Sequence, residues 1–199
     1  GWVRRRSVIG YALLAAAFCD LAISGQFSLE SGRIEAEDSS RDDAVLADLM
    51  ASLIKMQGKR YSWSLNGFTM RVNRRYRLQM QHLEREHLIS SRPVEWLGIS
   101  WGKRYRVNRI DRLKPLITQF ERVLIYGKEP SLETRLLIEI LGTMDLLGVI
   151  FCDKELHSRA KKRFYEIYSR EYSQHHTTLM AIRKEFRKAL RNSNILLTK

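Results

Sequence analysis

The side chains best suited to binding chemistry are the arginines between residues 71 and 85. At about 100° per residue, a helix over this segment has an apolar side and a separate basic side, formed by Arg71, Arg74, Arg75 and Arg85. No carboxylate lies among these arginines, so they repel one another unless an anion is bound. Because a guanidinium fork suits phosphate, the spacing predicts an anion-binding helix face, with a plain solvated face as the alternative.

A second candidate for binding is the segment 94–107, which is predicted to form a β-hairpin with strands over 94–100 and 103–107. Its tip region carries four large apolar side chains, Trp96, Leu97, Ile99 and Trp101. Cations flank this tip at Arg92, Lys103, Arg104 and Arg106. Tryptophan bordered by cations is typical of segments at lipid head-group depth. Three interpretations stay open: membrane insertion, contact with a partner or a second copy, and packing into the core.

The residues that could perform catalysis do not form a recognisable pattern. The sequence has no nucleophile elbow, phosphate-binding glycine loop, HExxH or dinucleotide fingerprint. The adjacent His175 and His176 stand in a polar linker, and the pattern places no histidine or second acid near Asp20. Cys19 and Cys152 lie in apolar helical runs and are predicted to be buried free thiols. We therefore expect no enzyme activity, no metal site and no cofactor.

The net charge of +13 over 199 residues indicates an anionic partner. The charge is unevenly distributed, because residues 7–50 hold an excess of acids. Basic residues outnumber acidic ones by thirteen to five in 71–122 and by twelve to four in 154–199. This distribution predicts distinct basic surfaces, suited to a membrane surface, a nucleic acid or a phosphorylated ligand.

The apolar pattern predicts the elements that must position these residues. An Ala/Leu-rich helix over 7–24 is apolar on most sides and should be the central, buried element. Ser31-Gly32 predicts a hairpin between residues 26–30 and 33–37. Further helices are predicted over 43–56, 63–69, 71–89, 111–126, 131–151, 154–170 and 176–192. The expected helix caps and breaks are Ser40 or Asp42, Asp111, Ser131 and the run Ser90–Pro93, and Trp63 is expected in the core.

These elements predict a mainly α fold: a single compact multi-helix domain around the buried Ala/Leu-rich helix, with two short β-hairpins. Residues 1–170 are predicted to form the helical domain, and residues 171–199 a basic C-terminal helix and tail. The N-terminal stretch looks superficially like a signal peptide, but Phe18 stands where a cleavage site needs a small residue. The apolar run over 8–19 is too short for a bilayer, so we expect neither a cleaved leader nor a membrane span.

Several segments together resemble the Golgi phosphoprotein 3 family. The stretch YALLAAAFCDLAISGQFSLESGRI resembles the family's central helix and first hairpin, and DDAVLADLM resembles the next helix. RYRLQMQHLEREHLI is similar to the arginine helix of the family, and EWLGISWGKRYRV to its protruding hairpin. LETRLLIEILGTMDLLGVIF and KKRFYEI follow in the family's order. The resemblance covers roughly residues 7–170 and rests on the order and spacing of these segments together.

The resemblance implies a single, mostly helical domain that binds membranes peripherally from the cytoplasmic side. Eukaryotic members recognise phosphatidylinositol 4-phosphate on the cytosolic face of the Golgi and act as adaptors. They hold glycosyltransferases through their cytosolic tails and engage coat proteins. The family also has bacterial members of unsettled function. For this chain the resemblance implies an anionic phospholipid membrane as partner, with glycosyltransferase tails or coat proteins added if the protein is eukaryotic.

The resemblance also implies a lipid pocket made by a tryptophan before the central helix, an arginine within that helix and two basic residues early in the arginine helix. By position, Arg75 matches the second of those basic residues, whereas the first falls at Val72, beside Arg71. The central-helix arginine falls near Leu14, and Arg5 or its neighbours would substitute for it. The family's tryptophan corresponds to Trp2, a few residues out of register. The candidate head-group residues are Trp2, Arg5, Arg71, Arg74 and Arg75.

Two other classes of function compete with membrane binding. A helix over 71–89 followed by a basic hairpin also describes a winged helix that binds nucleic acid. A wing that contacts DNA needs Arg, Lys, Ser or Gly at its tip, whereas this tip reads Trp-Leu-Gly-Ile-Ser-Trp, so we rank nucleic acid second. The third alternative is a purely structural interaction module, which would bind neither membranes nor nucleic acid. In any of these interpretations the hairpin could join copies of the chain in a homo-oligomer.

Overall fold

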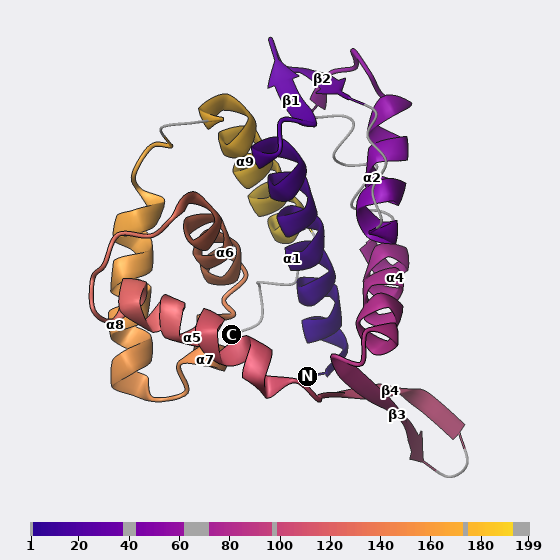
Figure 1. The fold of residues 1–199 in the computed structure, drawn as a ribbon, viewed down its shortest axis with the longest axis vertical. Helices are drawn as coiled ribbons and strands as arrows, with labels where there is room; N and C mark the ends of the chain where they lie inside the picture. Colours follow the sequence, from indigo (N-terminus) through magenta and orange to yellow (C-terminus); the bar gives the residue numbers. More distant parts are fainter. Residues whose placement is uncertain (1, 38–42, 62–71, 97–98, 173–174, 193–199) are drawn as a thin grey trace.

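The computed structural model describes residues 2–37, 43–61, 72–96, 99–172 and 175–192. The central element is helix α1 (Trp2–Ile23), and the helices around it are α2 (Ala44–Ile54), α4 (Val72–Arg85), α6 (Leu132–Thr143) and α9 (His176–Asn192). Figure 1 shows α4 and α9 on opposite sides of α1. The chain folds as a single, mainly α domain, as the sequence predicts.

The main core surrounds α1. This helix is apolar on most sides, so its side chains are removed from water only when other elements pack all round it. Phe18 is fully buried, and its ring lies 5.6 Å from that of Phe27 and 5.9 Å from that of Phe186, measured between centroids. The side chain of Leu14 is also buried in this cluster. Residues from both ends of the chain therefore share one core.

A second, smaller core joins α5 (Ile110–Leu124), α6, α7 (Leu147–Ile150) and α8 (Lys154–Tyr168). As predicted, the Ser131 hydroxyl caps α6 by accepting from the Thr134 amide at 3.3 Å. The prediction of one helix over 131–151 is wrong. The chain leaves the α-helix at Met144, Asp145 has φ +54°, and α7 starts at Leu147. Aspartate tolerates this left-handed conformation better than most residues, so it can end the helix.

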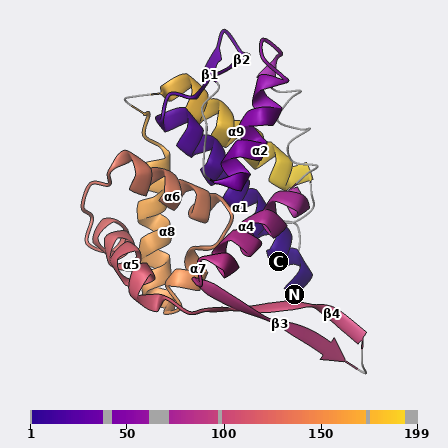
Figure 2. The same cartoon turned by 45° about the vertical axis from the view of Figure 1, so that its right-hand side comes forward.

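Helix α9 packs into the main core through Leu179, Ile182, Phe186 and Leu190. The backbone N–H of Leu29 also donates to the Thr178 hydroxyl at 3.0 Å, which ties α9 to the first hairpin. The described part of the predicted C-terminal segment 171–199 is thus built into the same core as residues 9–54. In Figure 2, α9 lies alongside α1 over much of its length.

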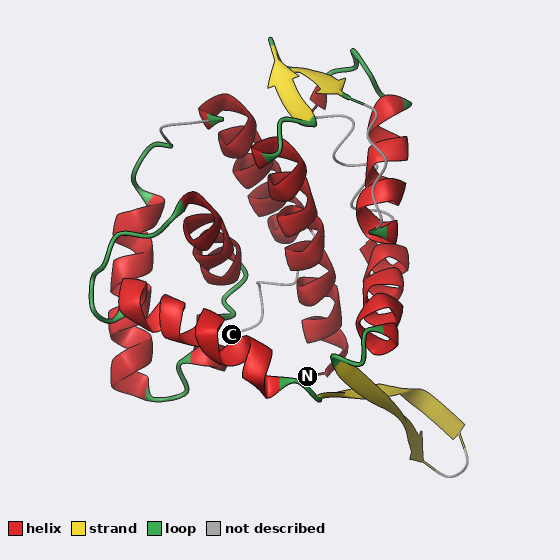
Figure 3. Cartoon of the chain, in the orientation of Figure 1, coloured by secondary structure: helices red, strands yellow, loops and turns green. Residues whose placement is uncertain are grey.

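Strands form two hairpins at separate ends of the helical body, as Figure 3 shows. The first pairs β1 (Phe27–Glu30) with β2 (Arg33–Ala36), and Ser31 and Gly32 both have positive φ. Two consecutive positive φ values are the signature of the tight turn that the Ser-Gly pair predicts. This hairpin is confirmed.

The second hairpin pairs β3 (Ile89–Trp96) with β4 (Ile99–Val107) and is longer than predicted. The prediction that Ser90–Pro93 ends the preceding helix is wrong, because α4 ends at Arg85 and His87 has φ +53°. Pro93 lies inside β3 opposite Lys103, which an edge strand tolerates because its amide need not donate. The register shifts between Val94, which faces Gly102, and Glu95, which faces Ser100, so β4 has a bulge with one extra residue at this point.

Three smaller predictions are corrected. Asp43 caps α2, in place of Ser40 or Asp42, and its carboxylate accepts from the amides of residues 45 and 46. Arg109, not Asp111, occupies the cap position of α5, and Asp111 pairs with it at 2.8 Å from the first helical turn. Cys152 is exposed because it follows the short α7 instead of lying inside a long helix. The predicted helix over 63–69, with Trp63, lies outside the described residues.

Cys19 is buried, as predicted, and it faces the interior beside α6. Burial, together with the nearby Glu139 and Asp20 carboxylates, raises the pKa of Cys19 to about 12. The thiol therefore stays protonated at neutral pH. Within the described ranges, none of the helices has the length and apolar character needed to cross a bilayer.

Candidate functional site

In the described part of the basic face of α4, Arg75 is buried, whereas Arg74 and Arg85 are exposed. Arg75 is 2% exposed, and its guanidinium lies 3.0 Å from the Asp48 carboxylate of α2 and 3.4 Å from the Ser52 hydroxyl. The Arg74 side chain is 61% exposed and lies 3.6 Å from the same carboxylate. The inference that no carboxylate meets these arginines is therefore wrong. The carboxylate of Asp48 is the anion that pairs with both Arg74 and Arg75. These ion pairs form only because α2 packs against α4.

The other predicted head-group residues fall mainly outside the described side chains. Arg71 is outside the described residues, and for Trp2 and Arg5 the structure gives the backbone of α1 alone. Arg74 and Arg75 lie together in the first turn of α4, whereas the side chains of Trp2, Arg5 and Arg71 lie outside the described part.

The aromatic hairpin extends away from the helical body at the end opposite the first hairpin (Figure 1). The backbone at Trp96, Ile99 and Trp101 belongs to β3 and β4, while Leu97 and the side chains of the other three lie outside the described part. Val107 is exposed at the root of this hairpin, and Val94 is exposed nearer the tip. Ile110, Leu113 and Ile117 of α5 are exposed as well. Apolar side chains are therefore in contact with solvent where the hairpin meets α5.

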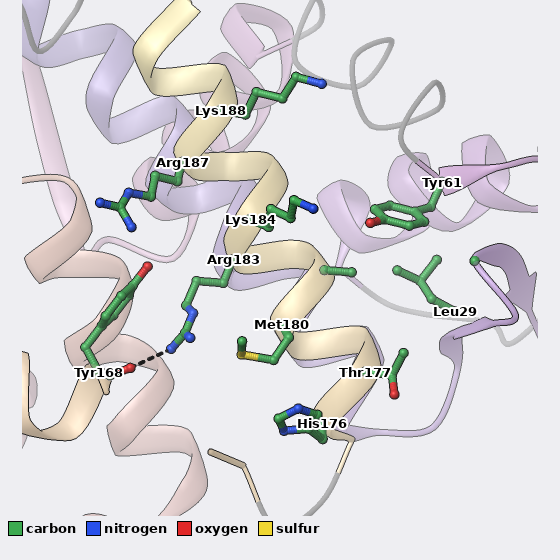
Figure 4. A pocket seen from close by; sticks show the side chains of 12 residues that line it. Leu29, Tyr61, Tyr168, His176, Thr177, Met180, Arg183, Lys184, Arg187 and Lys188 are labelled. Carbon is green, nitrogen blue, oxygen red and sulfur yellow. Dashed lines mark hydrogen bonds between the residues drawn. The ribbon is translucent and has the colours of Figure 1, made fainter. Parts of the chain in front are cut away.

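A hollow that the sequence did not predict lies along α9 and has a volume of about 890 Å³. We call it the α9 groove. Its lining includes the cations Arg183, Lys184, Arg187 and Lys188, the apolar side chains Leu29, Met180 and Ala181, and the aromatic rings of Tyr61 and Tyr168. In Figure 4, Lys184 and Lys188 point toward the side of Tyr61, and Arg183 points toward Tyr168.

Arg183, which lines the α9 groove, is paired with a buried carboxylate. Glu139 of α6 is 4% exposed and pairs with Arg135 at 2.9 Å and with Arg183 at 3.5 Å. The Tyr172 hydroxyl donates to the same carboxylate. Burial first, and then the Glu139 charge, raise the pKa of Tyr172, so this hydroxyl stays protonated and keeps donating. We call these four residues the Glu139 network.

Arg183 links the Glu139 network to the surface. Its guanidinium donates to the backbone carbonyl of Tyr168 at 2.9 Å and lies 4.1 Å from the centre of the Tyr168 ring. The signal that could have located this site was present in the sequence. Glu139 interrupts an apolar helical run, and the cations of α9 recur at four-residue spacing. In the described ranges, histidine, cysteine and acidic side chains do not gather into a group that could hold a metal ion.

The fold and these surfaces define a helical domain with basic surfaces and a protruding hairpin. A comparison with protein-family models identifies the family: the Golgi phosphoprotein 3 (GPP34) model matches residues 2–191. The chain belongs to this family, which confirms the resemblance seen in the sequence. The family is known for non-enzymatic adaptors that bind lipids and partner proteins. No curated protein matches the chain.

Proposed function

We propose that this protein is a peripheral membrane adaptor that binds anionic head groups, including phosphatidylinositol 4-phosphate. The observation that carries the proposal is the family match over residues 2–191. The net charge of +13 supports it, because basic residues near an anionic leaflet each contribute about 1 kcal/mol of binding free energy. On this proposal the protein sits on the cytosolic side of a membrane, at the Golgi in a eukaryotic cell.

Within this proposal Arg74 and Arg75, which are adjacent in α4, have different tasks. Arg74 is exposed and can approach a phosphate, together with Arg71, Trp2 and Arg5 as the remaining candidates. Arg75 is buried where α4 packs against α2, so its contribution is to pair with Asp48 and stabilise the fold. The Asp48 carboxylate shares its charge between both arginines, and the pair with Arg74 at 3.6 Å is loose enough to be exchanged for a phosphate.

We expect the double substitution Arg71→Glu with Arg74→Glu to weaken binding to vesicles that contain phosphatidylinositol 4-phosphate by roughly thirtyfold or more. Two cations near the membrane surface are lost and two anions are added. Sedimentation with vesicles measures the effect. Lys161→Glu with Lys162→Glu on the exposed side of α8 makes the same charge change and is the control. Equal binding by the Arg71/Arg74 variant and the wild type would contradict the proposed head-group role.

The hairpin is the proposed site of membrane insertion or of oligomerisation. Trp96→Ala with Leu97→Ala removes two large apolar side chains from its tip, so vesicle binding should fall by about a hundredfold if both insert. If the hairpin joins two copies instead, the same variant should keep its vesicle binding and change its sedimentation velocity. Wild-type behaviour in both measurements would remove the hairpin from the proposal. Glycosyltransferase tails and coat proteins are the proposed protein partners in a eukaryotic cell.

Nucleic-acid binding is the second candidate function, favoured by the net charge and by the helix-then-hairpin order of α4, β3 and β4. A mobility shift with duplex DNA that decreases with added salt, combined with no vesicle binding, would make it the leading function.

A further inference from the structure

The α9 groove carries three cations whose charges are not compensated in the described part of the chain. Lys184 and Arg187 are exposed, and so is Lys188. None of the three has a carboxylate within ion-pair distance among the described residues. Glu185, the acid of the same helix, is buried on the core side. Lys184 and Lys188 are four residues apart on one helix, where like charges destabilise the helix, so a bound anion would relieve a repulsion.

The groove is also shaped before any ligand arrives. Arg183 is held by Glu139 and by the carbonyl of Tyr168, and it covers the Tyr168 ring. The side chain of Arg183 therefore forms a fixed wall of the groove and does not rearrange when a ligand binds. The first hairpin supplies the other side, where Leu29 and Gly32 line the groove with Tyr61. A site with fixed walls loses little conformational entropy when it binds.

Positive charge continues beyond the groove on the side of the first hairpin. A second hollow of about 310 Å³ is lined by Ser31, Gly32, Arg33, Arg60 and Tyr61. It shares Gly32 and Tyr61 with the α9 groove, so the two hollows lie next to each other. Arg33 is fixed there by donating to the Gly58 carbonyl at 2.7 Å. A ligand seated near Tyr61 would have lysines of α9 on one side and arginines of the hairpin region on the other.

We propose that the α9 groove binds a small molecule that carries two or more phosphate groups on a compact organic body. The volume suits a ligand of this size. Lysine and arginine provide charge-assisted donors to phosphate, while Leu29, Met180 and Ala181 would contact the organic part. The free cations occupy little more than one turn of α9, which is short for a nucleic-acid duplex or an extended acidic peptide. Such phosphates occur free in solution and as lipid head groups.

This site is distinct from the membrane face of the proposed function. In Figure 1, α9 and α4 pack on opposite sides of α1, and the aromatic hairpin lies at the far end from the first hairpin. The inference therefore does not depend on Arg74 or on the tip of the second hairpin.

The test is calorimetric titration of the full chain with inositol hexakisphosphate as the probe. The triple substitution Lys184→Glu, Arg187→Glu and Lys188→Glu should weaken binding by about a hundredfold, because charge-assisted hydrogen bonds are replaced by repulsion. The matched control is Lys154→Glu, Lys161→Glu and Lys162→Glu on α8, which changes the net charge by the same amount. The control should stay within about threefold of the wild type. If the triple variant does not fold, Lys188→Ala alone should weaken binding by roughly fivefold.

Vesicles identify the source of the phosphate. They contain four parts phosphatidylcholine and one part phosphatidylinositol 4,5-bisphosphate. If the triple variant loses both inositol hexakisphosphate and vesicle binding, the ligand is a lipid head group. If it loses the soluble probe alone, the ligand is a free metabolite. The proposal is overturned if the wild type does not bind the probe, if the α8 control weakens binding as much as the α9 variant, or if a hexaglutamate peptide competes as well as the probe.

Discussion

Glu139→Ala is expected to lower the free energy of unfolding by about 3–5 kcal/mol, the usual cost of removing one partner from a buried ion pair. The substitution leaves Arg135 and Arg183 without their carboxylate, and both side chains are largely buried. It also leaves the Tyr172 hydroxyl without its acceptor. Urea denaturation followed by circular dichroism measures the change.

Two comparison variants make this result specific. Glu121→Ala removes an exposed carboxylate from α5 and should change the free energy of unfolding by less than about 0.5 kcal/mol. Glu139→Gln keeps the side-chain shape and an acceptor for Tyr172 but loses the charge, so it should fall between the alanine variant and the wild type. A loss below about 1 kcal/mol for Glu139→Ala would mean that water replaces the carboxylate and that the Glu139 network is not a stabilising unit.

Arg75→Ala should cost about 2–4 kcal/mol of folding free energy, because it breaks the ion pair with Asp48 and empties the space of a side chain that is 2% exposed. Arg85→Ala, at the exposed end of the same helix, should cost less than about 0.5 kcal/mol. Thermal or urea unfolding measures both. The structural role also predicts that vesicle binding, measured below the unfolding transition, changes little in the Arg75 variant.

The Asp48 partner provides a second check. Asp48→Asn combined with Arg75→Met removes both charges, so this double variant should be more stable than Arg75→Met alone. If Arg75→Ala left stability unchanged but abolished vesicle binding, Arg75 would be a head-group ligand, and the division of tasks between Arg74 and Arg75 would be wrong.

Local signals in the sequence were enough to predict most of the fold. The apolar surface of residues 7–24 identified α1 as the central helix, and Ser31-Gly32 identified the first turn, because both features depend on neighbours in the chain. The Ser131 cap was predictable for the same reason. The break at Asp145 was not predictable, since the segment stays apolar on both sides of it and the bend depends on how α6 and α7 pack on α8.

The sites were harder to predict because their charges meet across the fold. Arg135 stands four residues before Glu139, so that ion pair was visible in the sequence. Arg183, which follows Glu139 by 44 residues, was not. In the same way the Arg75–Asp48 pair exists only because α2 lies against α4. Spacing within one helix identified arginines suited to phosphate, but tertiary packing decided which of them is already paired with a carboxylate.

The contact between α1 and α9 also has a consequence for folding during synthesis, because the two helices are far apart in the sequence. Helix α1 leaves the ribosome early, but the side chains that cover it, including Leu179, Ile182 and Phe186, are made more than 150 residues later. At ordinary elongation rates this delay is on the order of ten seconds. During that time the apolar side of α1 that α9 buries in the folded protein is exposed to solvent. We expect the nascent chain to need a chaperone until α9 emerges.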